Sequence, residues 1–259
     1  MSNKKNTTIF ILSALALLCL LTVLVWADAD DPQAIESITE GVSTRFNASS
    51  IAVPNISTVT AGNVSQINFT ALSVTKAWAG YYGEITGRIV LENIERYVFY
   101  NWTSTEPKGE IYAATDNSIT WASIKCFNET DTGAINLSSQ EAKYGIDSID
   151  VDGIDETFNL TDHIAFQVGT NPIGVDSCPS TYVYGAAGYQ TTHFSNVLLT
   201  DAATLVFTTI IENDEIDNNT DVVGFDGVTH DFQLLLAEDG HDGGPEDVTT
   251  TYYFWAEIE

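Results

Sequence analysis

The chain has 259 residues, of which 44% are hydrophobic and 17% are charged, and its formal net charge at pH 7 is −27. A chain of this length and apolar content can bury a core of its own, which excludes an intrinsically disordered protein. Residues 144–259 hold 22 acidic residues and no Lys or Arg. Nucleic acid and anionic lipid are therefore excluded as partners of this half, because both bind through clusters of Lys and Arg.

The N-terminus has the features of an export segment. Lys4 and Lys5 precede an apolar run at 7–27, and no basic residue follows before Arg45. This asymmetry orients the segment with its start in the cytoplasm and the rest of the chain outside. Residues 1–29 are predicted to form a hydrophobic helix, either a cleaved signal peptide or a retained membrane anchor. On both interpretations the protein is extracellular and contacts the membrane only through this segment.

Residues 30–60 are predicted to form an extended arm or stalk. They contain two glycosylation motifs and show little regular periodicity of apolar residues. The stretch 49–59, SSIAVPNISTV, has strand character and could pair with its own domain or with a neighbouring subunit. The alternative is a flexible linker.

Residues 61–259 are predicted to form one all-β domain, a β-sandwich or jelly roll. Short segments rich in β-branched and aromatic residues alternate with Gly, Asn and Asp. The predicted strands lie within 63–74, 83–93, 96–103, 109–115, 118–127, 163–169, 180–185, 196–201, 204–213, 230–239 and 250–259. One short helix is expected at 138–144, with Ser138 as its N-cap and Glu141 reaching back in a capping box.

Asparagine glycosylation motifs are unusually frequent. Nine of the fifteen asparagines after residue 30 lie in Asn-x-Ser/Thr, where chance would place about three. Of the nine motifs, the one at Asn101 is the weakest candidate because Asn101 shares a strand face with Tyr97 and Phe99. We predict glycans at the other eight: Asn47, Asn55, Asn63, Asn68, Asn128, Asn136, Asn159 and Asn218.

The cysteines fit an exported domain. Cys19 lies in the apolar run, so the remainder of the chain holds only Cys126 and Cys178. Two cysteines in an oxidising compartment usually pair. The alternative is two buried free thiols.

The segment 145–159, GIDSIDVDGIDETFN, threads acidic residues between apolar ones. Oxygen ligands around a glycine that permits a tight turn suit calcium, although the spacing does not match an EF-hand. The candidate ligands of a structural Ca²⁺ are Asp147, Asp150, Asp152 and Asp155. On the other interpretation the aspartates form a solvated edge, and the loop attaches to the core through Ile149, Val151 and Ile154.

No enzymatic signature was found. The sequence has no nucleophile elbow, zinc-protease motif, phosphate loop or dinucleotide fingerprint. The histidines are isolated along the sequence and are expected to be structural: His163, His193, His230 and His241. We therefore predict that the protein is not an enzyme.

Three stretches carry a resemblance to a known group of proteins. They are AWAGYYGEITGRIVLEN followed by FYNWT (77–103), VDSCPSTYVYG (175–185) and EDGHDGGPEDVTTTYYFWAEIE (238–259). These stretches resemble secreted, largely uncharacterised, β-rich archaeal cell-surface proteins of the filament or surface-layer type. The resemblance implies an envelope address, a β-rich exported domain and a disulfide between Cys126 and Cys178.

Two functions fit these features. The first is a structural or adhesive subunit of a filament, sheath or surface layer, which associates with itself or with other envelope proteins. The alternative is a monomeric module that binds carbohydrate or another envelope ligand. In the second case Trp78, Tyr81 and Tyr82 would supply the aromatic platform for sugar stacking, whereas otherwise they belong to the core.

Overall fold

The computed structural model describes residues 31–41, 61, 66, 75–104, 107–131, 135–185, 190–212, 222–238 and 250–258. The predicted hydrophobic helix at 1–29 and most of the predicted arm lie outside these residues. In the part of the chain that the structure describes, no helix is long and apolar enough to cross a membrane.

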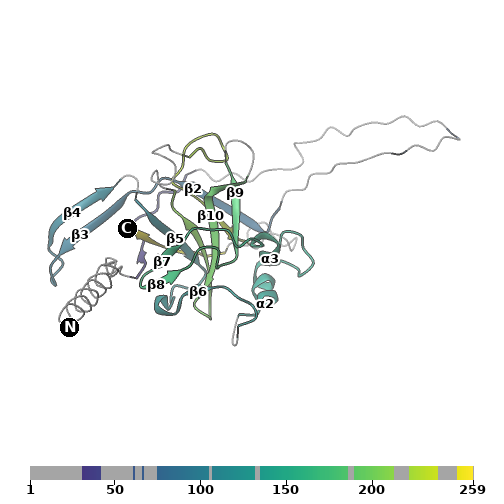
Figure 1. The fold of residues 1–259 in the computed structure, drawn as a ribbon, viewed down its shortest axis with the longest axis horizontal. Helices are drawn as coiled ribbons and strands as arrows, with labels where there is room; N and C mark the ends of the chain where they lie inside the picture. Colours follow the sequence, from purple (N-terminus) through teal and green to yellow (C-terminus); the bar gives the residue numbers. More distant parts are fainter. Residues whose placement is uncertain are drawn as a thin grey trace, which may run out of the picture.

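A seven-stranded antiparallel sheet forms the body of the protein (Figure 1). Its strands lie in the order β1, β13, β5, β11, β10 and β6, and β9 also pairs with β10. Their bounds are Gln33–Ala34 (β1), Tyr253–Ile258 (β13), Gly109–Ala114 (β5), Leu205–Ile210 (β11), Gln190–Thr200 (β10), Lys125–Cys126 (β6) and Ser180–Tyr184 (β9). The start of the predicted arm thus joins the sheet, because β1 pairs with β13.

Three two-stranded sheets accompany the large one. They are β2 (Trp78–Gly83) with β12 (Phe232–Ala237), β3 (Gly87–Glu92) with β4 (Val98–Ser104), and β7 (Phe166–Val168) with β8 (Asn171–Ile173). The helices are short: η2 (Trp121–Ser123), α2 (Leu137–Glu141), η3 (Ala142–Tyr144) and α3 (Ile154–Thr157). This strand content confirms the all-β prediction.

Strand β5 shows how the large sheet divides the core. Ile111 and Ala113 belong to one buried cluster, which also holds side chains of β12, α2 and α3 and against which Trp78 of β2 packs. Tyr112 and Ala114 belong to a second cluster, which holds side chains of β7 and β8. Since successive side chains of a strand point to opposite faces, both faces of the central strands are covered.

The predicted helix is present, but its capping was predicted wrongly. Helix α2 begins at Leu137, and its N-cap is Asn136, whose side chain accepts a hydrogen bond from the Ser139 N–H at 2.9 Å. Glu141 is buried and accepts from the Ile154 N–H at 3.0 Å. An asparagine caps as well as a serine does, and this cap frees Glu141 to hold α3 beside α2.

Candidate functional site

A hairpin formed by β3 and β4 projects from the body (Figure 1). Among the described residues these two strands pair only with each other. All seven residues of β4 are exposed, and so are the last five of the six in β3. The hairpin is nevertheless rich in large apolar side chains, which distinguishes it from the rest of the described surface.

The turn and the base of the hairpin are both defined by local interactions. Asn93 closes the turn, because its side-chain oxygen accepts from the backbone N–H groups of Glu95 at 3.1 Å and Tyr97 at 2.9 Å. At the base, a Cβ atom on Gly87 would lie 2.9 Å from the Cβ of Pro107 and 3.0 Å from Cγ2 of Ile258. The glycine therefore lets the hairpin leave the body in close contact with β13.

The strand register separates the two faces of the hairpin. Ile89 lies opposite Trp102, and Leu91 lies opposite Tyr100, so these four side chains share one face. We call these four residues the apolar face. Each of them is between 47% and 55% exposed, and the rings of Tyr100 and Trp102 stack edge to face with centroids 4.8 Å apart.

The opposite face of the hairpin is mixed in character. Val90 lies opposite Asn101, and Arg88 lies opposite Thr103. Arg88 forms an exposed ion pair with Glu36 at 3.0 Å. Asn101 is exposed and its neighbour Phe99 is 84% exposed. Sharing a face with Phe99 therefore does not bury Asn101, so this neighbour gives no reason to rank the Asn101 motif below the others.

The predicted calcium ligands do not gather in one place. The Asp150 carboxylate accepts from the backbone N–H of Asp147 at 2.8 Å. Asp152 accepts the Thr75 hydroxyl through its side chain and the Trp78 indole N–H through its carbonyl, the latter at 2.7 Å. Of the four aspartates, only Asp155 lies in the cluster of carboxylates that the structure assembles.

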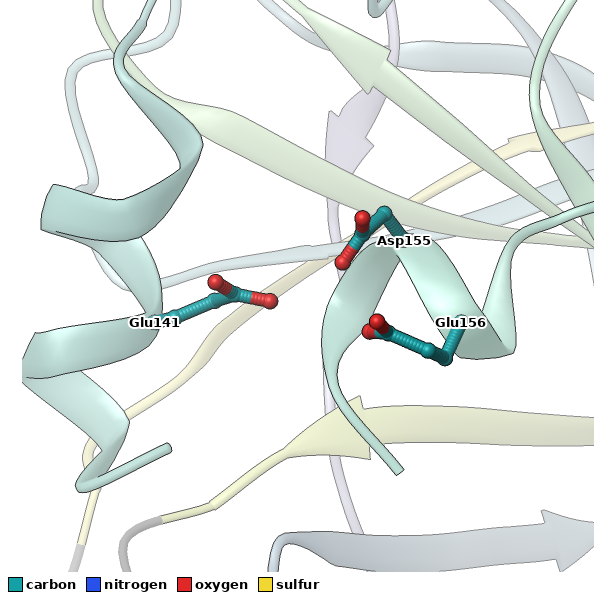
Figure 2. Close-up of side chains that lie close together, drawn as sticks. All are labelled: Glu141, Asp155 and Glu156. Atoms are coloured by element: carbon teal, nitrogen blue, oxygen red, sulfur yellow. The ribbon is translucent and has the colours of Figure 1, made fainter. Parts of the chain in front are cut away.

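That cluster consists of Glu141 from α2 with Asp155 and Glu156 from α3 (Figure 2). Their candidate ligand atoms all lie within 4.8 Å of one another. Gly153 makes this approach possible, because a Cβ atom there would lie 2.9 Å from Oε1 of Glu141. Neither glutamate was predicted as a ligand. The sequence pattern places Glu141 in a capping box. Glu156 directly follows Asp155, but only aspartates were predicted as ligands.

Electrostatic repulsion and burial both raise the pKa values of Glu141 and Glu156 in this cluster. Burial raises the pKa of Glu141, the hydrogen bond from the Ile154 N–H opposes this, and the charges of Asp155 and Glu156 raise it further. A hydrogen bond with Asp155 is the main reason why the pKa of Glu156 is also raised. A proton or a hard cation would relieve this repulsion.

Of the three apolar residues expected to anchor the segment 145–159 to the body, only one does so. Ile149 is 86% exposed and Val151 is 92% exposed, so neither anchors the loop. Ile154 is fully buried in the first core cluster. Together with the indole of Trp78, Ile154 holds the segment in place.

Cys126 and Cys178 form a disulfide, as expected, with their Cα atoms 4.7 Å apart. It links β6 to the segment just before β9. His163 supports this region, because its Nε2 atom accepts from the backbone N–H groups of Ser177 at 3.1 Å and Cys178 at 2.9 Å. A ring used in this way is structural, which agrees with the expectation for this histidine.

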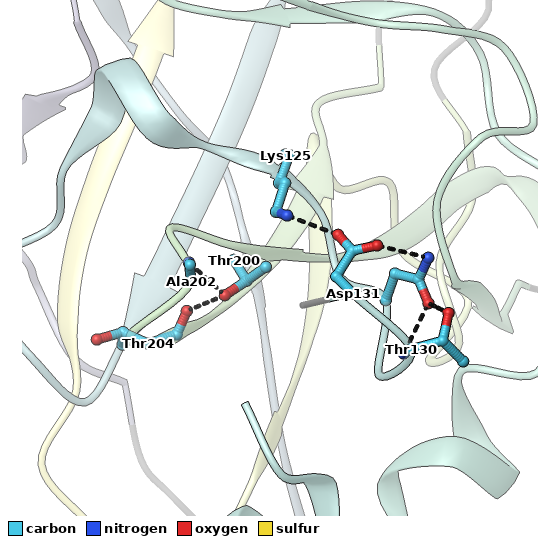
Figure 3. A network of polar contacts seen from close by, with 7 residues as sticks. Lys125, Thr130, Asp131, Thr200, Ala202 and Thr204 are labelled. Atoms are coloured by element: carbon cyan, nitrogen blue, oxygen red, sulfur yellow. Dashed lines mark hydrogen bonds and ion pairs between the residues drawn. The ribbon is translucent and has the colours of Figure 1, made fainter. Parts of the chain in front are cut away.

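Three of the eight predicted glycosylation sites lie among the described residues, and all three are exposed. Asn128 accepts from the Thr130 hydroxyl at 2.8 Å and donates to Asp131, which also pairs with Lys125 at 2.6 Å (Figure 3). Asn136 uses its oxygen as the cap of α2. The third is Asn159, whose amide nitrogen donates to a backbone carbonyl. The remaining five lie outside the described residues: Asn47, Asn55, Asn63, Asn68 and Asn218.

The three aromatic residues considered for sugar stacking do not share one surface. Trp78 packs against Phe207 in the core, with ring centroids 6.2 Å apart. Tyr81 and Tyr82 follow each other in β2 and therefore point to opposite faces. Tyr82 is half exposed and lies edge to face with the half-exposed Phe225, their centroids 4.9 Å apart.

Comparison with known proteins adds no family to these observations. No family model matches the chain, and no curated protein or solved structure is significantly similar to it.

Proposed function

We propose that this protein is a non-enzymatic, glycosylated extracellular protein that serves as a structural or adhesive subunit of a filament, sheath or surface layer. Its partners are further copies of itself or other envelope proteins. The body would be a β-sandwich, in which the sheet of β2 and β12 faces the large sheet across the first core cluster.

The exposed hairpin carries this proposal. Monomeric soluble proteins rarely display contiguous apolar patches larger than a few hundred Å², and patches above that size mark interaction sites. An isolated two-stranded hairpin is also only marginally stable in water. A hairpin with an apolar face that the described body leaves uncovered is therefore best explained by a partner that covers it.

Three further features support the extracellular address. The N-terminal segment has the charge pattern of an export signal. The disulfide between Cys126 and Cys178 is typical of oxidising compartments. The described asparagines of the predicted glycosylation motifs are exposed.

Electron microscopy of the native envelope with an antibody against this chain tests the proposal. We expect label on ordered filaments, sheaths or arrays, and a glycosylated, oxidised chain in the extracted material. Finding the chain dispersed over the envelope, or reduced and unglycosylated in the cytosol, would contradict the proposal.

A binding module for carbohydrate is the second candidate, and the pair of Tyr82 and Phe225 favours it. Two half-exposed rings in edge-to-face contact offer a surface on which a sugar ring can stack. A glycan array distinguishes the two functions. A monomer whose glycan binding is lost in Tyr82→Ala would support the module and argue against assembly.

A structural calcium ion remains part of the proposal. Carboxylate oxygens are the ligands that Ca²⁺ prefers, and Glu141, Asp155 and Glu156 lie close enough together to share a cation.

A further inference from the structure

The chemistry of the β3–β4 hairpin indicates what kind of partner covers it. The apolar face, Ile89, Leu91, Tyr100 and Trp102, contains no charged residue, and its side chains carry two polar groups, the Tyr100 hydroxyl and the Trp102 indole N–H. A partner must therefore present an apolar surface of its own. Phosphates require charged groups that this face lacks, and a sugar or base that stacked on Tyr100 and Trp102 would find few groups on this face to hydrogen-bond it.

The charge of the hairpin differs from that of the whole chain. Residues 87–104 contain two arginines, Arg88 and Arg96, and two glutamates, Glu92 and Glu95, so their net charge is zero, whereas the chain carries −27. Two copies of such an acidic protein repel each other over most of their surfaces. The hairpin is a place where they can approach with little electrostatic penalty.

The glycosylation motif and the ion pair of the hairpin lie on its opposite face, so neither obstructs the apolar face. Asn101 and Thr103 of the glycosylation motif lie on the side of β4 that points away from the apolar face, and so does Arg88 with its ion pair to Glu36. A glycan on Asn101 would shield that side and leave the apolar face accessible.

We propose that the apolar face of the β3–β4 hairpin is a self-association surface, which packs against the same face of a second copy of this chain. A two-fold dimer buries the same surface on both copies, so an apolar face can cover itself in this arrangement. Stacking two hairpins would create four strands in two layers around a shared core, which supplies the packing that a single hairpin lacks.

The small area of the apolar face places the contact among the weaker interfaces. If all four side chains were buried completely, two copies of the apolar face would together bury about 1,000 Å², which is less than the roughly 1,200–2,000 Å² of stable specific interfaces and typical of weak, transient ones. Such a contact is weak in dilute solution and becomes populated where copies are concentrated, as they are on a cell surface. This inference rests on the proposed function and names the partner and the contact.

Two neighbouring residues of β3 provide a matched pair of variants. Leu91→Glu places a charge on the apolar face, and Val90→Glu places the same charge on the opposite face of the same strand. Sedimentation velocity of the full-length protein at physiological ionic strength measures the monomer–dimer equilibrium. We expect Leu91→Glu to weaken dimerisation at least about tenfold, because like charges meet across the two-fold axis, and Val90→Glu to leave it nearly unchanged.

Folding and competing partners are checked on the same samples. Both variants should melt at the wild-type temperature under dilute conditions, which shows that the hairpin variants fold. Flotation with neutral phosphatidylcholine vesicles tests a lipid partner. A monomeric wild type that floats with vesicles through Leu91 would overturn the inference.

The remaining outcomes separate this inference from the proposed function. Dimers that resist Leu91→Glu, or that respond equally to both variants, would place the contact elsewhere and overturn the inference while leaving self-assembly intact. A wild type that stays monomeric at every concentration also overturns it. In that case, ordered arrays in the native envelope would still support the proposed function.

Discussion

Strand β5 and strand β4 have opposite environments, although the exposed strand has the stronger strand-forming sequence. All six residues of β5, GEIYAA, are buried, whereas all seven residues of β4, VFYNWTS, are exposed. The exposed strand contains three aromatic residues and the buried strand contains one. Apolar content therefore predicts that a segment is a strand, but it does not predict whether the covering layer comes from the same chain.

The difference arises from the number of neighbours that each strand has. β5 pairs with β13 on one side and β11 on the other, and both of its faces meet a core cluster. β4 pairs with β3 alone among the described residues. The following predictions test this contrast between the body and the hairpin.

The largest expected effect is on the core of the body. Phe207 in β11 is fully buried and lies against Phe158 and Tyr252, so Phe207→Ala should lower the free energy of unfolding by about 3–5 kcal/mol. Phe99→Ala in the hairpin should change it by less than about 0.5 kcal/mol. Guanidinium denaturation measures both. Equal losses would mean that the body covers the hairpin after all.

The disulfide should stabilise the body without affecting association through the hairpin. Cys126 and Cys178 are 52 residues apart in the sequence, and replacing both with Ser should lower the free energy of unfolding by about 2–4 kcal/mol. Dimerisation measured below the melting temperature should persist. As a check, thiol labelling of the unfolded wild-type exported chain should find neither cysteine free, and labelling of either would contradict the prediction.

The cap of α2 should have a smaller effect, and three variants isolate it. Asn136→Ala removes the cap and should lower the free energy of unfolding by about 1 kcal/mol. Asn136→Asp removes the glycosylation motif and keeps a capping oxygen, so stability should be retained. Ser138→Ala removes the hydroxyl that the sequence pattern favoured as the cap and should have little effect. If Ser138→Ala lowered the free energy of unfolding more than Asn136→Ala does, Ser138 would be the N-cap after all, as the capping box predicts. Thermal melts distinguish these cases.

The acidic cluster gives the smallest effect, and its sign depends on pH. The pKa of Glu141 is raised in the folded protein, so its ionised form destabilises the fold at pH values above the folded pKa. This penalty disappears as pH falls toward the unfolded pKa. In chelator at neutral pH, Glu141→Gln, which keeps an acceptor for the Ile154 N–H, should raise the melting temperature by up to roughly 2–4 °C. The gain should vanish near pH 4.

Calcium should reverse the difference in melting temperature between the wild type and Glu141→Gln. If the cluster binds Ca²⁺, millimolar calcium should raise the melting temperature of the wild type and leave that of Glu141→Gln nearly unchanged. A wild-type melting temperature that responds neither to calcium nor to chelator would remove calcium from the proposal.

The sequence by itself determined the strand-rich class, because the period-two alternation of β-branched and aromatic residues is a local property of the chain. It also predicted that Cys126 pairs with Cys178, since these are the only two cysteines after the apolar N-terminal run. Local signals also predicted a short helix at 138–144, although its N-cap is Asn136, two residues before the predicted Ser138.

Only the tertiary structure decided which side chains meet across the chain. Glu141 and Glu156 come together because α2 and α3 pack side by side, and Trp78 reaches Asp152 across 74 residues of sequence. Likewise, no local pattern distinguishes the exposed apolar face from buried strands such as β11. Burial depends on what packs against a strand, and that is a property of the whole fold.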